Sequence, residues 1–153
     1  MRFRQFQLTL LLSATASVAL LGLPAFPASA ADSPAIIQPE ALTWAPFTAL
    51  PPGTQIAVLQ GDPSKAGPFV VRLKLPAGYE IMTHSHPTDE VITVMSGKLR
   101  MAFGDKADAS GAQALAPGSL MILPAGAYHH LWSDAESVVE IHSTGPFGIN
   151  MAH

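Results

Sequence analysis

Short apolar runs alternate with turn residues over most of the chain, and this pattern predicts strands. Apolar and β-branched side chains recur in short segments that are bounded by Gly, Pro, Asp and Ser. The segments are 54–60, 69–75, 79–84, 90–95, 98–103, 112–115, 120–123, 129–132 and 137–142. Short strands at regular spacing, without a convincing amphipathic helix, predict an all-β sandwich or barrel.

The first thirty residues follow a different pattern, which is typical of an export signal. Arg2 and Arg4 form a positively charged start, Leu8–Leu23 is apolar, and Ala28-Ser29-Ala30 has the small residues of a cleavage site. This apolar run is shorter than the roughly 20 residues that cross a bilayer as a helix. A retained membrane anchor is the alternative. We expect cleavage between Ala30 and Ala31, and a mature protein in the periplasm or outside the cell.

These patterns divide the chain into four parts. A signal peptide is expected at 1–30, an extended Pro- and Ala-rich arm at 31–53, a barrel at 54–149 and a C-terminal tail at 150–153. The part after the signal has a length that suits one domain with one core. The sequence contains no cysteine, so an exported domain of this kind relies on packing and on any bound metal for its stability.

Charge changes this picture only by what it excludes. Eight Lys and Arg residues stand against 11 Asp and Glu residues, and loss of Arg2 and Arg4 with the signal would take the formal net charge from −3 to −5. Because basic clusters are absent from the sequence, nucleic acid and anionic membrane surfaces are poor partners. We expect a small-molecule ligand or substrate, no nucleic acid, and no membrane contact after signal cleavage.

Three histidines and one glutamate have spacings that suit a single metal ion. Side chains two apart in a strand point the same way, so His84 and His86 can face one interior together. The turn residues Pro87-Thr88-Asp89 follow, and a hairpin there would bring the Glu90 carboxylate back beside the imidazoles. His129 would arrive from a distant strand after a Pro-x-Gly turn.

The stretches Gly78–Gly97 and Gly118–Ser133 together resemble the two motifs of the cupin superfamily. Those motifs are Gly-x5-His-x-His-x3-4-Glu-x6-Gly and Gly-x5-Pro-x-Gly-x2-His-x3-Asn, and every fixed position is matched except the last, where Ser133 replaces Asn. The resemblance implies a double-stranded β-helix, which is a jelly-roll barrel with one metal in its mouth. The ligands it implies are His84, His86, Glu90 and His129.

The same resemblance leaves the metal and the activity open. Three imidazoles and one carboxylate suit Zn, Mn, Fe, Ni or Cu. One function class is an enzyme that acts on a small oxygenated molecule as a dioxygenase, an isomerase or a lyase. The other is a non-catalytic module that binds a metal or a small ligand without turnover.

The segment 137–142 adds a candidate acid-base pair. Glu140 and His142 share one face of this strand, and Val139 and Ile141 share the other. We expect Glu140 and His142 to face the cavity as proton-transfer groups; the alternative places both on an exposed face. His130 follows His129 directly, so we expect it on the outer face of its own strand.

The arm offers two arrangements. Trp44 and Phe47 are its large apolar residues, and they can either cross to a second subunit in a homodimer or fold back on their own barrel.

Overall fold

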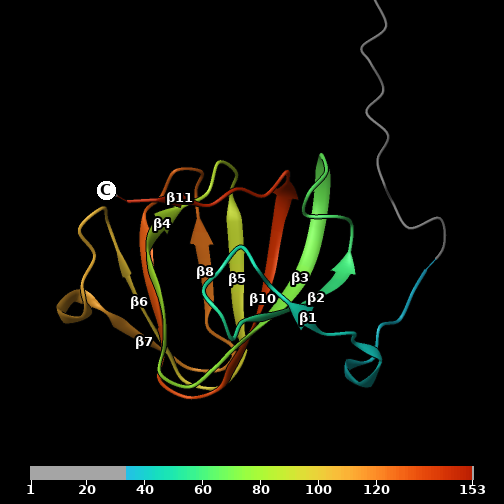
Figure 1. The fold of residues 1–153 in the computed structure, drawn as a ribbon, viewed down its shortest axis with the longest axis horizontal. Helices are drawn as coiled ribbons and strands as arrows, with labels where there is room; N and C mark the ends of the chain where they lie inside the picture. The colour runs from blue at the N-terminus through green and yellow to red at the C-terminus, as the bar shows by residue number, and fades with distance from the viewer. Residues whose placement is uncertain (1–33, 153) are drawn as a thin grey trace, which may run out of the picture.

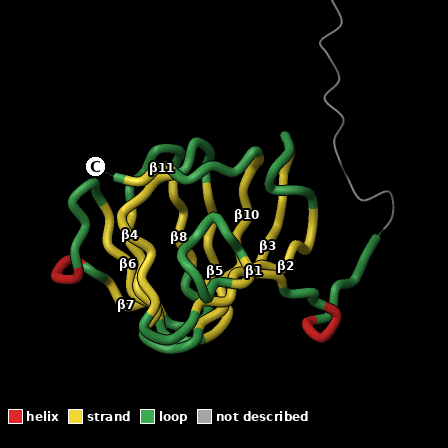
Figure 2. The backbone as a smooth tube through the Cα atoms, in the orientation of Figure 1, coloured by secondary structure: helices red, strands yellow, loops and turns green. Residues whose placement is uncertain are grey.

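The computed structural model describes residues 34–152, and nearly all of its regular structure is β. The strands are β1 (Ala45–Pro46), β2 (Gln55–Gln60), β3 (Gly67–Leu75), β4 (Tyr79–Ser85), β5 (Glu90–Ser96), β6 (Leu99–Phe103), β7 (Gln113–Leu115), β8 (Leu120–Leu123), β9 (His129–Ser133), β10 (Ser137–Gly145) and β11 (Asn150–Met151). Two 3-10 turns, η1 (Pro39–Ala41) and η2 (Ala109–Gly111), lie outside the barrel wall (Figure 2). Within residues 34–152, no helix has the length and hydropathy needed to cross a bilayer.

The strands form two antiparallel sheets that face each other (Figure 1). One sheet has the order β1-β2-β3-β10-β5-β8 and the other has the order β11-β4-β9-β6-β7. Every segment predicted as a strand from the sequence is a strand here, with ends that differ by at most a few residues. The structure confirms the predicted all-β double-stranded β-helix.

The core lies between the two sheets and follows from the alternation within each strand. In β3, Phe69, Val71, Leu73 and Leu75 are at most 5% exposed, and the residues between them are only partly buried. Residues two apart in a strand share a face, so one face of β3 fills the barrel. Strand β10 continues this layer, because it pairs with β3 from Ser137–Leu75 to Gly145–Gly67.

The N-terminal arm folds back on its own barrel in this structure. Its strand β1 pairs with β2, and the backbone N–H of Phe47 donates to the Thr54 carbonyl at 3.0 Å. The Lys74 ammonium lies 4.6 Å from the centroid of the Trp44 ring. These contacts all lie within one chain and correspond to the folded-back alternative.

Residues 150 and 151 are part of the barrel, whereas a tail was expected at 150–153. Asn150 and Met151 form β11, which pairs with Ser85 and His84 of β4. A strand of two residues is too short to show an alternation of apolar and polar positions in the sequence. The pairing with β4 therefore appears only in the three-dimensional structure.

Gly97 gives a test of how tightly this barrel is packed. It has a φ of +95°, and a Cβ there would clash with the Ser137 side chain and lie 2.5 Å from the Glu136 carbonyl oxygen. Gly104 has a similar φ of +109° with no atom within 4 Å of the same Cβ position. Replacement by Ala at positive φ costs about 1 kcal/mol at either site. We expect Gly97→Ala to lose about 1 kcal/mol or more beyond Gly104→Ala, because the clash requires a backbone shift.

Urea unfolding of the two variants measures this difference. Equal losses for Gly97→Ala and Gly104→Ala would contradict the close packing of Gly97 against the start of β10.

Candidate metal centre

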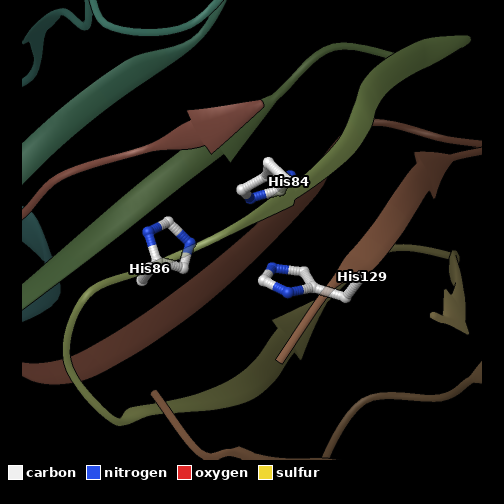
Figure 3. A group of neighbouring side chains, drawn as sticks. All are labelled: His84, His86 and His129. Atoms are coloured by element: carbon white, nitrogen blue, oxygen red, sulfur yellow. The ribbon is translucent and has the colours of Figure 1, made fainter. Parts of the chain in front are cut away.

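Three imidazoles meet between the two sheets. His84 lies in β4, His86 follows directly after that strand, and His129 begins β9. Each offers one nitrogen, and these atoms all lie within 4.8 Å of one another. Figure 3 shows the three side chains converging on one region. The side chains are buried, with at most 5% of each residue exposed.

The pairing of β4 with β9 creates this arrangement. His84 and His129 are directly opposite each other in the ladder, and directly opposed side chains lie on the same face of a sheet. Their ring centroids are 4.2 Å apart.

A bulge in β4 turns His84 toward the interior. The register shifts between Ile81 and His84, so that β4 has one more residue here than β9. Ile81 and His84 are both buried, whereas Met82 is 56% exposed. Strict alternation from Ile81 would turn His84 outward, so the extra residue is what allows both side chains to face the core.

Backbone carbonyls fix the orientation of each imidazole. In all three residues Nδ1 lies within hydrogen-bond distance of a carbonyl oxygen, which can only accept. Nδ1 therefore carries the proton and Nε2 keeps a lone pair for a metal. The pairs are His84 with Met82 at 2.8 Å, His86 with Gly148 at 2.7 Å and His129 with Ala127 at 3.0 Å.

Glu90 approaches the histidines from the opposite sheet. Its Oε2 is 3.4 Å from His86 Nε2 and 3.8 Å from His129 Nε2. This oxygen is buried and has no hydrogen-bond partner in the described structure. Donor atoms about 2.1 Å from one tetrahedral ion lie about 3.4 Å apart. A buried acceptor without a donor, beside imidazole nitrogens at this spacing, fits a divalent cation.

Burial sets the protonation of the site. Desolvation lowers the pKa of His84 to about 3 and that of His86 to about 4, and it also lowers the pKa of His129. The same effect raises the pKa of Glu90 to about 8. At neutral pH the three imidazoles are uncharged and ready to bind a metal, and Glu90 holds a proton that a cation would displace.

The cavity beside these residues is small and apolar. Its space for water is about 40 Å³, enough for only a few water molecules. Its walls come from strands of both sheets. The rest of the lining is formed by Phe47, Leu50, Phe147 and Ile149. Phe147 stacks on the His86 ring, with centroids 4.3 Å apart and an interplanar angle of 17°.

Glu140 and His142 lie outside this cavity, which corrects the expectation that they face it. Val139 and Ile141 line the cavity instead. Glu140 forms an ion pair with Arg72 at 2.8 Å, and the His142 side chain is 51% exposed. The reason is packing, since β10 is flanked by β3 and β5 and uses its apolar face to fill the core.

His130 lies on the outer face of β9, as predicted. Its Nε2 is 2.7 Å from Glu80 Oε1, and its Nδ1 is 3.1 Å from the Thr83 hydroxyl. The ring also stacks on Trp132, with centroids 4.0 Å apart. These contacts bury it on the face of β9 that points away from the candidate metal ligands.

Ser133, which replaces the Asn of the second motif, stabilises a turn. Its hydroxyl donates to the Ala135 carbonyl at 2.7 Å. It lies at the far end of β9 from His129, so the substitution leaves the candidate ligands unchanged.

Comparison with known proteins gives the same fold. The sequence profile of the ChrR cupin-like domain matches residues 32–148, and no curated protein sequence matches the chain. The polyketide cyclase RemF from Streptomyces resistomycificus is similar, with a TM-score of 0.66, 12% identity, and coverage of 79% of this chain and 87% of RemF.

Two further solved structures are also similar. An RmlC-like cupin from Ralstonia eutropha has a TM-score of 0.60 and 17% identity, and the match covers 76% of this chain and 72% of the Ralstonia chain. KdgF from Halomonas sp. has a TM-score of 0.57 and 16% identity, and the match covers 74% of this chain and 96% of KdgF. At such identities the likeness concerns the fold alone.

Proton release provides a test of whether Glu90 is a ligand. At pH 7 a carboxyl group with a pKa of about 8 is about 90% protonated, so ligation should release about one proton per ion. The release should fall as the pH rises through 8, because the carboxylate is then already ionised. Calorimetric titration with Zn²⁺ in two buffers of different ionisation enthalpy measures the number of protons.

The matched control is Glu90→Gln, which has no proton to lose at this position. Equal proton release from the wild type and from Glu90→Gln would show that the metal does not displace a proton from Glu90.

Proposed function

We infer the function of this chain from the fact that it belongs to the family of ChrR cupin-like domains, and we propose that it binds one divalent transition metal and, at that metal, a small organic ligand. His84, His86 and His129 would hold the ion through Nε2, and Glu90 would add a carboxylate oxygen. A bound six-coordinate ion would supply a Lewis acid with two positions open to an oxygen-bearing ligand, and a tetrahedral Zn²⁺ would accept such a ligand by expanding to five-coordinate. The donor set suits Zn, Mn, Fe, Ni or Cu.

One observation carries this proposal. Glu90 Oε2 is buried without a hydrogen-bond partner and lies 3.4 Å from His86 Nε2. A buried polar atom without a partner costs about 1–3 kcal/mol. A cation would satisfy this oxygen and the nearby imidazole lone pairs at the same time.

The cavity favours ligand capture over turnover. Among the residues that line it, the four candidate ligands are the only titratable ones in the described chain. Glu140 and His142, the expected proton carriers, lie on the other face of β10. We therefore propose a binding module as the function that the geometry supports best.

An enzyme is the second candidate. The polyketide cyclase RemF has a similar fold. A reaction at this site would have to proceed without a separate side-chain acid or base, and dioxygenase chemistry meets that condition better than an isomerase or a lyase that moves a proton.

Removal of single ligands tests the metal site. We expect His84→Ala, His86→Ala and His129→Ala to lose bound metal and the associated rise in melting temperature. An ion present at 100 times its dissociation constant stabilises the folded state by about 2.7 kcal/mol. His142→Ala is the matched control, since this histidine is on the exposed face. Elemental analysis and thermal unfolding with each of the five metals measure both effects.

One equivalent of metal in the wild type and in His142→Ala, with little in the ligand variants, supports the proposal. A wild-type protein that neither contains metal nor is stabilised by any of the five ions would contradict it.

We also propose that the protein is exported with cleavage after Ala30. Residues 1–33 lie outside the described residues, so the support comes from the charged start, the apolar run and the Ala28-x-Ala30 site. Intact mass measurement of the periplasmic protein should give a chain that begins at Ala31, and Ala30→Arg should prevent processing. A full-length chain in the cytoplasm would contradict export.

A further inference from the structure

The walls of the cavity beside the metal centre are apolar on every side. Leu73, Val139 and Ile141 come from one sheet, and Ile81 and Leu131 come from the other. Within the described chain, the polar side chains that reach this cavity are the four candidate metal ligands.

The backbone of the lining strands offers few additional polar contacts. The lining strands β3, β4, β5, β9 and β10 each have a neighbouring strand on both sides. Most of their N–H and C=O groups are therefore used in the ladders. The side chains that can satisfy a polar group of a ligand lie at the metal end.

An apolar path continues outward from the cavity. Phe47, Phe147 and Ile149 line the cavity and also a groove of about 390 Å³ on the outside of the barrel. Ala49 and Pro63 extend the groove, and among residues 34–152 Ser64 is the one polar side chain that lines it. Because the inner cavity has room for only a few water molecules, the tail of a ligand whose head lies at the metal would pass these residues into the groove and remain in largely apolar surroundings.

We propose that the ligand is a small amphiphile with one oxygen-bearing, metal-binding head and an otherwise apolar body. This inference rests on the proposed metal site and specifies the ligand class. A second polar group on the ligand would lose its water without gaining a partner. Sugars, amino acids and dicarboxylates are thereby excluded, and short monocarboxylates are suitable probes.

Calorimetric titration of the Zn²⁺-loaded protein with acetate, butyrate and hexanoate tests the apolar body. Each buried methylene should strengthen binding about fourfold. Adipate and 6-hydroxyhexanoate share the six-carbon chain of hexanoate and carry a second polar group. We expect both to bind at least about tenfold more weakly than hexanoate. The metal-free protein should bind none of the five probes tightly, since the head would lack its partner.

Matched variants test the wall itself. Val139→Thr places a hydroxyl on the cavity wall, whereas Val138→Thr places one on the outer face of the same strand. Hexanoate affinity should fall several-fold in Val139→Thr and stay unchanged in Val138→Thr. Thermal unfolding of both variants reports whether the fold is retained, and the probe series on the wild type tests the proposal without any variant.

The outcomes separate this inference from the metal site. Two results would contradict the amphiphilic ligand class and leave the metal site intact in a protein that binds Zn²⁺. One is equal affinity for acetate, butyrate and hexanoate, and the other is adipate binding as tightly as hexanoate. If the protein binds none of the five metals, both proposals fail. A rising series that depends on Zn²⁺ and is weakened by a second polar group supports both.

Discussion

The antiparallel pairing of β4 with β9 is the interaction on which the site depends, because it joins two motifs that lie far apart in the sequence. It places His84 directly opposite His129, and the bulge after Ile81 lets both the core residue and the ligand face inward. One residue more or less in β4 would turn His84 to the outer face. The candidate metal site therefore depends on strand register as much as on residue identity.

Burial then determines the chemistry of the assembled site. Four polar side chains are removed from water, and three of them meet backbone carbonyls that orient their Nε2 atoms inward. Glu90 has no such partner, so the cost of its burial is relieved by a proton or by a metal. The apolar walls that strengthen this effect also restrict what else can enter. The same lack of polar groups would favour a cation and would select the proposed amphiphilic ligand.

Much of the fold and the clustering of His84, His86 and His129 could be predicted from the sequence, for identifiable reasons. Turn residues separate the strands, and the spacing of His84, His86, Glu90 and His129 matches the cupin motifs. The face of β10 could not be predicted, because Val139 and Glu140 alternate with equal regularity whichever side is buried. Strand β11 and the hydrogen bond from His86 to the Gly148 carbonyl could not be predicted either. A two-residue strand and a backbone acceptor leave no pattern in the sequence.

The segment after β10 both lines the mouth of the barrel and fixes the orientation of His86, a candidate metal ligand. Phe147 covers the His86 ring, and the next residue, Gly148, accepts its Nδ1–H. A bulky guest that pushed Phe147 aside would pull at this carbonyl and free the imidazole to rotate. A wide ligand would thus weaken the binding of the ion that it needs, whereas a narrow ligand would leave His86 in place. Selection of ligands by their width would then follow from the two contacts that hold His86.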